Sequence, residues 1–178
     1  MSHLAGAAKP SFDSKAFRRS LGRFPTGVTV VMAEVPGEPP VGLTVSSFNS
    51  VSLEPPLVVW SLSKHSSSMW IFEQCERYSI QVLAADQADL AMRFASGTHE
   101  QRFLDLDLTT CPNGSPRLAS PVAAWFECHN RHRHQEGDHV VLIGEVENCH
   151  HADLMPLIYH SGGFDLTPAV LSAESNAR

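Results

Sequence analysis

Residues 41–62, VGLTVSSFNSVSLEPPLVVWSL, decide the fold of this chain. The stretch begins with alternating apolar and polar residues, becomes rich in hydroxyl side chains from Thr44 to Ser52, and continues after Pro55-Pro56 as an apolar strand. A strand that carries small hydroxyl residues in place of β-branched ones gives up core packing. It gains space in which backbone amides and short donors can approach a flat polar ligand closely.

The amino-acid composition limits the classes of protein to which the chain can belong. A length of 178 residues with 43% apolar and 18% charged residues indicates one globular domain with a hydrophobic core. The net charge of −6 argues against a nucleic-acid partner, and no apolar run approaches the ~20 residues of a membrane-spanning helix. Residues 1–12 lack the features of a signal peptide, and the four cysteines form no C-x-x-C pair. We therefore predict a cytoplasmic protein with reduced thiols and no nucleic-acid or membrane partner.

Hydrophobic periodicity predicts the order of the elements. It favours strands at 27–35, 78–84, 122–133 and 139–148, and helices that begin at Asp13 or Ser14, near Met69 and after a cap at Asp86, with 97–114 mostly loop. No G-x-G-x-x-G follows a strand, so a Rossmann domain is not supported. The pattern favours a mainly β protein with short helices, built as an antiparallel barrel. We expect an N-terminal extension at 1–12, one domain at 13–170 and a disordered tail at 171–178.

Residues 42–57 also carry a family resemblance. Their pattern, Gly-x-Thr-x-Ser-Ser-Phe-x-Ser-Val-Ser-Leu-x-Pro-Pro-Leu, is similar to the signature of the flavin reductase family, as are FRRSLGRFPTGVTVV at 17–31 and PLIYHSGGF at 156–164. The resemblance implies a split antiparallel β-barrel that binds flavin at a homodimer interface. It also implies an NAD(P)H:flavin oxidoreductase that supplies reduced FMN or FAD to a separate monooxygenase.

Two serines ahead of a predicted helix are candidate phosphate ligands. Ser66 and Ser68 precede Met69, and their spacing alone is explained by helix capping. The family places similar serines against the cofactor phosphate, where hydroxyl and amide donors at a helix start favour an anion. Arg93 is explained equally well as a phosphate ligand or as an exposed helix arginine.

The hydroxyl-rich strand is the candidate contact for the flavin ring. A strand edge with small hydroxyls matches the hydrogen-bonding atoms along one edge of an isoalloxazine, although a solvated strand face gives the same pattern. The predicted cofactor-binding residues, besides Ser66, Ser68 and Arg93, are Thr26, Leu43, Thr44, Val45, Ser46, Ser47, Ser61, Phe94 and Phe164. Phe164 is equally compatible with covering the flavin or nicotinamide ring and with packing in the core.

His139 is the candidate catalytic residue. Without the resemblance, a single histidine at the start of a strand is explained as structural. Gly137-Asp138-His139 matches the family's Gly-Asp-His, which implies that His139 orients NAD(P)H or tunes the reduced flavin. Hydride transfer between the two cofactors requires no protein nucleophile, and no catalytic triad or paired-carboxylate motif is present.

The sequence predicts no metal site and leaves the exact activity and the choice of cofactors open. The histidines at 129, 132, 134, 150 and 151 fit no standard zinc spacing, so we predict no metal site. A flavin carrier without turnover, and a flavoenzyme that retains its FMN and acts on an organic substrate, are alternatives to the reductase. The sequence does not distinguish FMN from FAD or NADH from NADPH.

Overall fold

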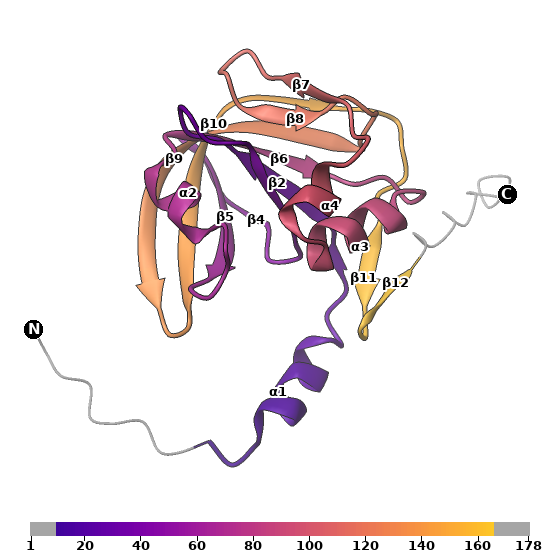
Figure 1. Cartoon of the computed structure of the whole chain (residues 1–178). Helices are drawn as coiled ribbons and strands as arrows, with labels where there is room; N and C mark the ends of the chain where they lie inside the picture. Colours follow the sequence, from indigo (N-terminus) through magenta and orange to yellow (C-terminus); the bar gives the residue numbers. More distant parts are fainter. Residues whose placement is uncertain (1–9, 166–178) are drawn as a thin grey trace, which may run out of the picture.

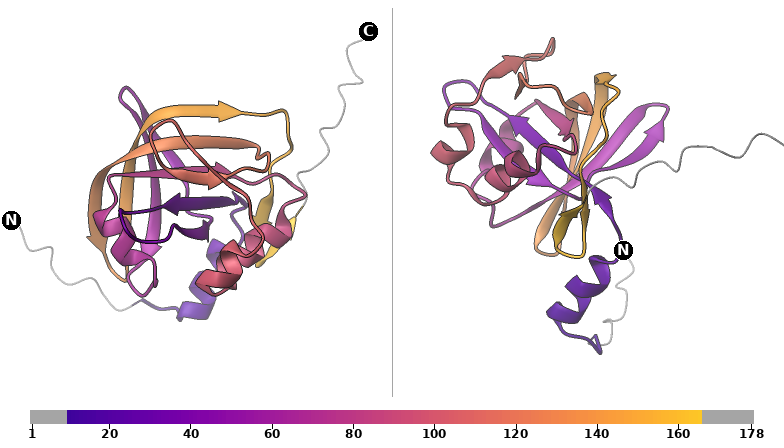
Figure 2. Two further views of the ribbon diagram at one scale, coloured as in Figure 1. Left: turned by 45° about the horizontal axis from the view of Figure 1, so that its top comes forward. Right: turned by 90° about the vertical axis from the view of Figure 1, so that its right-hand side faces the viewer.

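A curled antiparallel sheet of seven strands forms the body of the molecule. The computed structural model describes residues 10–165, and the sheet order is β3-β2-β6-β9-β10-β5-β4 (Figures 1 and 2). Its strands are β2 (Thr29–Ala33), β3 (Val41–Val45), β4 (Asn49–Leu53), β5 (Pro56–Ser63), β6 (Arg77–Val82), β9 (Ala124–Glu136) and β10 (His139–His151). Because β3 and β4 are the two edges of this sheet and do not pair, the barrel is split along them. This arrangement confirms the predicted mainly β split barrel.

Two small sheets complete the fold. One contains β1 (Thr26–Gly27), β11 (Ile158–His160) and β12 (Gly163–Asp165), and the other pairs β7 (Leu108–Thr110) with β8 (Pro116–Leu118). The β11–β12 turn contacts the start of the chain, since Ser161 N donates to Gly22 O at 2.9 Å. The C-terminal end of α1 and the β11–β12 turn are thus joined.

Residues 10–165 contain four helices, which lie outside the sheet. They are α1 (Ser14–Leu21), α2 (Met69–Gln74), α3 (Ala88–Ser96) and α4 (His99–Phe103). As predicted, α1 starts at a cap in which the Asp13 carboxylate accepts from Ala16 N. This helix has no buried residue and projects from the barrel (Figures 1 and 2). None of the helices in residues 10–165 combines the length and apolar composition needed to cross a bilayer.

The structure adds detail to one predicted segment and corrects one predicted helix cap. The segment 97–114 is mostly loop, as expected, but it also contains the short elements α4 and β7; Thr98 and Gln101 form a reciprocal capping box at the start of α4. Asp86 does not cap α3, whose N-cap is Gln87. The Gln87 side chain accepts from Ala84 N and donates to Pro121 O, which ties the helix start to two loops.

Strand boundaries also differ from those predicted. The strand expected at 27–35 is divided between β1 and β2, and β9 and β10 are longer than expected. The extra length of β9 and β10 is an exposed, polar extension of the hairpin, where the apolar pattern gives no signal. Residues 1–9 and the predicted tail at 171–178 lie outside the described residues.

Two apolar clusters fill the interior. The first centres on Trp60, Phe72 and Tyr78, whose rings meet edge to face at 5.0–6.2 Å between centroids. The second includes Met32 and Phe94 and lies where α3 packs on the sheet. Both clusters support the face of the barrel on which β3 and β5 end.

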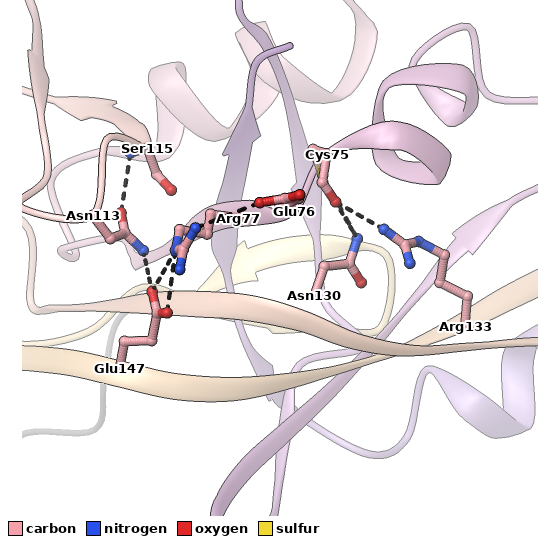
Figure 3. A network of polar contacts seen from close by, with 8 residues as sticks. All are labelled: Cys75, Glu76, Arg77, Asn113, Ser115, Asn130, Arg133 and Glu147. Atoms are coloured by element: carbon pink, nitrogen blue, oxygen red, sulfur yellow. Dashed lines mark hydrogen bonds and ion pairs between the residues drawn. The ribbon is translucent and has the colours of Figure 1, made fainter.

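The C-terminal end of α2 is fixed to β9 by two side chains (Figure 3). Asn130 donates to Phe72 O and Cys75 O at 3.0 and 3.2 Å, and Arg133 donates to the same carbonyls at 2.9 and 2.8 Å. These bonds satisfy carbonyls that a helix end leaves unpaired, and the arginine charge complements the helix dipole. The start of α2, which carries Ser66 to Ser68, is thereby held in place.

Candidate functional site

A hollow of about 390 Å³ opens where β3 and β5 end. Helix α3, helix α4 and the β9–β10 hairpin complete its wall. It is lined by nine of the residues predicted from the sequence: Leu43, Thr44, Val45, Ser46, Ser47, Ser61, Ser66, Phe94 and His139. Residues predicted as separate cofactor contacts, far apart along the chain, therefore lie around one cavity.

Some of the hydroxyl groups in this wall hold the frame of the cavity. The Ser47 hydroxyl accepts from Ser61 N at 3.0 Å and donates to Ser61 O at 3.3 Å, which joins the β3–β4 link to β5. The Thr44 hydroxyl donates to Ala91 O at 2.7 Å and fixes α3 above β3. Since β3 is an edge strand, its outer backbone groups and the exposed Ser46 face the opening.

Arg102 is the charged residue of this wall that the sequence prediction missed, along with Leu62, Ser63 and Ala95. Its Nε donates to Gly97 O at 2.8 Å and its Nη1 donates to Gly42 O at 2.9 Å. The ion pairs of residues 10–165 do not include it, and burial lowers the pKa of its guanidinium. A half-buried cation without a carboxylate partner suits an anionic group of a ligand.

One signal in the sequence, the capping box of α4, could have led to Arg102. Thr98-x-x-Gln101 marks the start of a helix, and Arg102 follows in the last turn of that short helix. Treating 97–114 as a loop hid the fact that α4 presents this arginine to the cavity.

Ser66 and Ser68 do not act as the helix cap that was the alternative interpretation. Ser68 stands at the N-cap position of α2, but its side chain makes no capping bond. Instead the Ser66 hydroxyl accepts from Ser68 N at 3.3 Å. Ser66 faces the 390 Å³ hollow, whereas Ser68 faces an adjoining hollow of about 300 Å³, and Arg102 lines both.

His139 stands at the rim of the cavity, on the first residue of β10. Its Nδ1 lies 2.7 Å from Oδ1 of Asp138, and this bond holds the pKa of the Asp138 carboxyl below its usual range. Lys64 fixes the turn, since its N donates to Asp138 O at 3.0 Å and its Nζ donates to Gly137 O at 2.9 Å. The ring is oriented by Asp138, which leaves Nε2 as the nitrogen available to a ligand.

Three predicted residues lie away from both hollows. Arg93 donates through Nε to Gln101 O at 2.7 Å and through Nη2 to Leu104 O, so its guanidinium serves the end of α4. Phe164 packs edge to face on Tyr159, with centroids 5.7 Å apart, and contacts the second core cluster. Thr26 lines a larger hollow of about 1060 Å³ beside α1, and its buried Oγ1 has no hydrogen-bond partner.

The histidine-rich hairpin does not gather a ligand set. The rings of His132 and His134 lie 6.0 Å apart. Within residues 10–165, no three His, Cys, Asp or Glu side chains lie where they could hold a metal ion together. A separate charged cluster joins Arg77 to Glu147 at 3.1 Å, with Asn113 donating to the same carboxylate at 2.9 Å (Figure 3).

The chemistry of the cavity fits a flavin. The outer backbone groups of the edge strand β3, with the exposed Ser46 directly after it, offer donors and acceptors in one line, as a flat ring with polar atoms along one edge requires. Ser66 and the guanidinium of Arg102 lie in the same wall and suit a phosphate. The fold and this cavity together define a split-barrel flavoprotein.

Comparisons with known proteins support this class. Residues 21–167 match the family model described as a flavin reductase like domain, and the chain belongs to this family. It is 44% identical over 152 residues to the FMN reductase (NADH) SmoA of Agrobacterium fabrum, covering 85% of each chain. It is 39% identical to the stachydrine N-demethylase reductase subunit Stc3 of Rhizobium meliloti, covering 93% of this chain and 71% of that protein.

A solved structure agrees with the sequence relatives. The chain superposes with a TM-score of 0.82 on the NADH:FAD oxidoreductase SgcE6 of Streptomyces globisporus, in complex with NAD and FAD fragments. The two are 32% identical, and the match covers 93% of this chain and 99% of that one. The family and the fold predicted from residues 42–57 are therefore confirmed.

Proposed function

We propose that this chain is an NAD(P)H:flavin oxidoreductase that reduces FMN or FAD and releases the reduced flavin to a separate monooxygenase. The observation that carries the proposal is the single cavity in which the β3 edge, Ser66, Arg102 and His139 meet. Relatives with printed activities support it, since SmoA is named an FMN reductase (NADH) and Stc3 a reductase subunit of an N-demethylase.

The residues of the cavity divide into binding and positioning roles. The β3 edge from Leu43 to Ser47 holds the ring edge, and Ser66 and Arg102 hold the phosphate. The bound flavin supplies the hydride-accepting chemistry, so the protein needs no nucleophile. The side chains instead hold the flavin and nicotinamide rings in contact, in the relative orientation that hydride transfer requires. His139, oriented by Asp138 at 2.7 Å, stands at the rim where a nicotinamide enters.

The cavity also suggests why flavin is released. It is open, and Ser46 and Ser47 line both the 390 Å³ hollow and the 1060 Å³ hollow beside α1. A ligand held in an open site by a few polar contacts exchanges readily, as a shuttled product requires.

A homodimer and a cytoplasmic location belong to the same proposal. Helix α1 buries none of its residues and exposes Phe17, Leu21 and the following Phe24, by 49%, 57% and 71%. An exposed apolar patch of this kind marks an interaction surface, and it lies beside the larger hollow. The four cysteines are free thiols, which is typical of a reducing compartment.

The direct test is a turnover assay with both flavins and both nicotinamide nucleotides. We expect saturable acceleration of NADH or NADPH oxidation by added FMN or FAD. If neither nucleotide is oxidised faster than by free flavin alone, the reductase proposal is wrong. Tight stoichiometric flavin with no nucleotide consumption would identify a carrier, and a rate independent of added flavin would identify an enzyme that retains its cofactor.

A further inference from the structure

A second hollow shares Arg102 with the cavity. This adjoining hollow, of about 300 Å³, is lined by Ser67, Ser68, Trp70, Thr98, His99 and Arg102, among others. Arg102 lines both hollows, and Ser66 faces the first while the next two residues face the second. A ligand phosphate bound at Arg102 would therefore lie at the junction of two spaces, with room on both sides.

Two aromatic side chains, Trp70 and His99, line the second hollow. Trp70, in the first turn of α2, is 42% exposed although an indole of this size is usually packed. His99 stands at the start of α4, and its ring is held against Phe103 at 5.2 Å between centroids. Two exposed aromatic rings on separate elements offer a stacking surface to a flat heterocycle.

The polar groups of this hollow suit a sugar and a phosphate. Ser67 is exposed there, and the Thr98 hydroxyl accepts from Gln101 N at 3.3 Å, which leaves its proton free to donate. Arg102 supplies the positive charge, and no carboxylate lines the hollow. Aromatic surface, hydroxyls and one cation together match a nucleotide rather than a purely apolar ligand.

We infer that the second hollow is an adenosine subsite, so that this protein takes FAD in preference to FMN. The inference rests on the proposed function for the placing of the ring and the first phosphate. In this arrangement the diphosphate of FAD crosses Arg102 and the turn at Ser66–Ser68, and the adenine stacks on Trp70. FMN fills the first hollow only.

The test compares the binding of FAD and FMN without any nicotinamide nucleotide, by quenching of flavin fluorescence. We expect the native chain to bind FAD about five- to a hundredfold more tightly than FMN, the range that one stacked base provides. Trp70→Ala should remove most of this preference by weakening FAD alone, and Trp70→Phe should retain much of it. AMP should compete with FAD in the native chain and compete less in Trp70→Ala.

Two controls make the result decisive. Met92→Ala removes a side chain that is 53% exposed on α3 and lines neither hollow, so the ratio of FAD to FMN affinity should not change. Thermal unfolding of each variant shows whether the barrel is intact. Equal affinity for FAD and FMN in the native chain, or equal weakening of both by Trp70→Ala, would overturn the adenosine subsite. Because binding is measured without turnover, a protein that prefers FAD but oxidises no NAD(P)H would refute only the reductase.

Discussion

The guanidinium of Arg102 donates to the carbonyl of Gly42 across 2.9 Å and joins α4 to the edge strand β3. The two residues are far apart in sequence. Because Gly42 precedes the hydroxyl-rich run that lines the cavity, this bond ties α4 to the cavity wall. A Cβ on Gly42 would lie 2.6 Å from Cε1 of Phe94 and 3.3 Å from Cζ of Phe103. The absence of a side chain at this position is what lets α3 and α4 close over β3.

We expect Gly42→Ala to destabilise the protein by about 1–3 kcal/mol, since the added methyl group overpacks a buried site. Phe94 is fully buried and has little room to move, so the displacement should reach Arg102 and weaken flavin binding as well. Urea unfolding and flavin titration measure the two effects. The matched control is Gly27→Ala, because a Cβ on Gly27 would meet nothing within 4 Å. A stable Gly42→Ala variant with native flavin affinity would contradict this account of the packing.

Arg102→Ala should weaken FMN binding by about ten- to a hundredfold, the range expected for a charged hydrogen bond of about 1.5–3 kcal/mol. Riboflavin, which has no phosphate, should lose much less affinity. Arg93→Ala is the comparison, because Arg93 donates to the carbonyls of Gln101 and Leu104. That variant should lose stability without changing the ratio of FMN to riboflavin affinity. A selective loss of FMN in Arg93→Ala would return the phosphate role to Arg93.

The sequence predicts the barrel and most of the cavity for a physical reason. Ser46 and Ser47 directly follow the short edge strand β3, and local patterns of alternation and turns report such elements directly. Ser66 precedes a helix that begins at Met69, as the spacing of apolar residues predicts. Nine predicted residues meet in one hollow because the ends of β3 and β5, the segment before α2, α3 and the start of β10 converge there.

The rest of the site depends on side-chain partners that local patterns do not report. Arg93 and Arg102 are both helical arginines followed by phenylalanine, and both donate to backbone carbonyls; only the tertiary structure shows that Arg102 also lines the cavity. Phe164 has two compatible roles in the sequence, and its packing on Tyr159 is visible only once β11 and β12 pair. The sequence also gives no sign that Trp70 lines a hollow, because the spacing of apolar residues does not show which tryptophans are exposed.

His139→Ala should lower the rate of NAD(P)H oxidation more than it lowers flavin affinity. The histidine stands at the rim of the cavity, with 43% of its side chain exposed, and not at its hydroxyl-lined wall. Steady-state kinetics at saturating flavin, together with flavin titration, separate the two effects. His134→Ala, on the exposed strand of the same hairpin, controls for general effects on the β9–β10 turn. A larger loss in flavin affinity than in turnover would mean that His139 contacts the flavin and does not position the nicotinamide.

The buried thiols predict that stability falls in alkaline solution. Burial raises the pKa of Cys75 and of Cys111 to about 11, and burial also raises the pKa of Cys128. In the unfolded chain a thiol ionises near ~8.5, so above that pH the unfolded state binds fewer protons than the folded state. The contribution of these thiols to the free energy of unfolding is therefore fully present below pH ~8.5. Between pH ~8.5 and the folded pKa values it decreases by at most ~1.4 kcal/mol per pH unit for each thiol.

Urea unfolding under reducing conditions between pH 7 and pH 9.5 tests this dependence. That window lies below the range near pH ~10 in which an unfolded tyrosine ionises, which matters because burial also raises the pKa of Tyr78. Cys75→Ala should flatten the decline, since one buried thiol no longer contributes. Cys149→Ser should leave the slope unchanged, because the Cys149 thiol is exposed. A stability that stays level through pH 9.5 would show that these thiols ionise in the folded chain, and that the interior beside Trp60 and Tyr78 admits water.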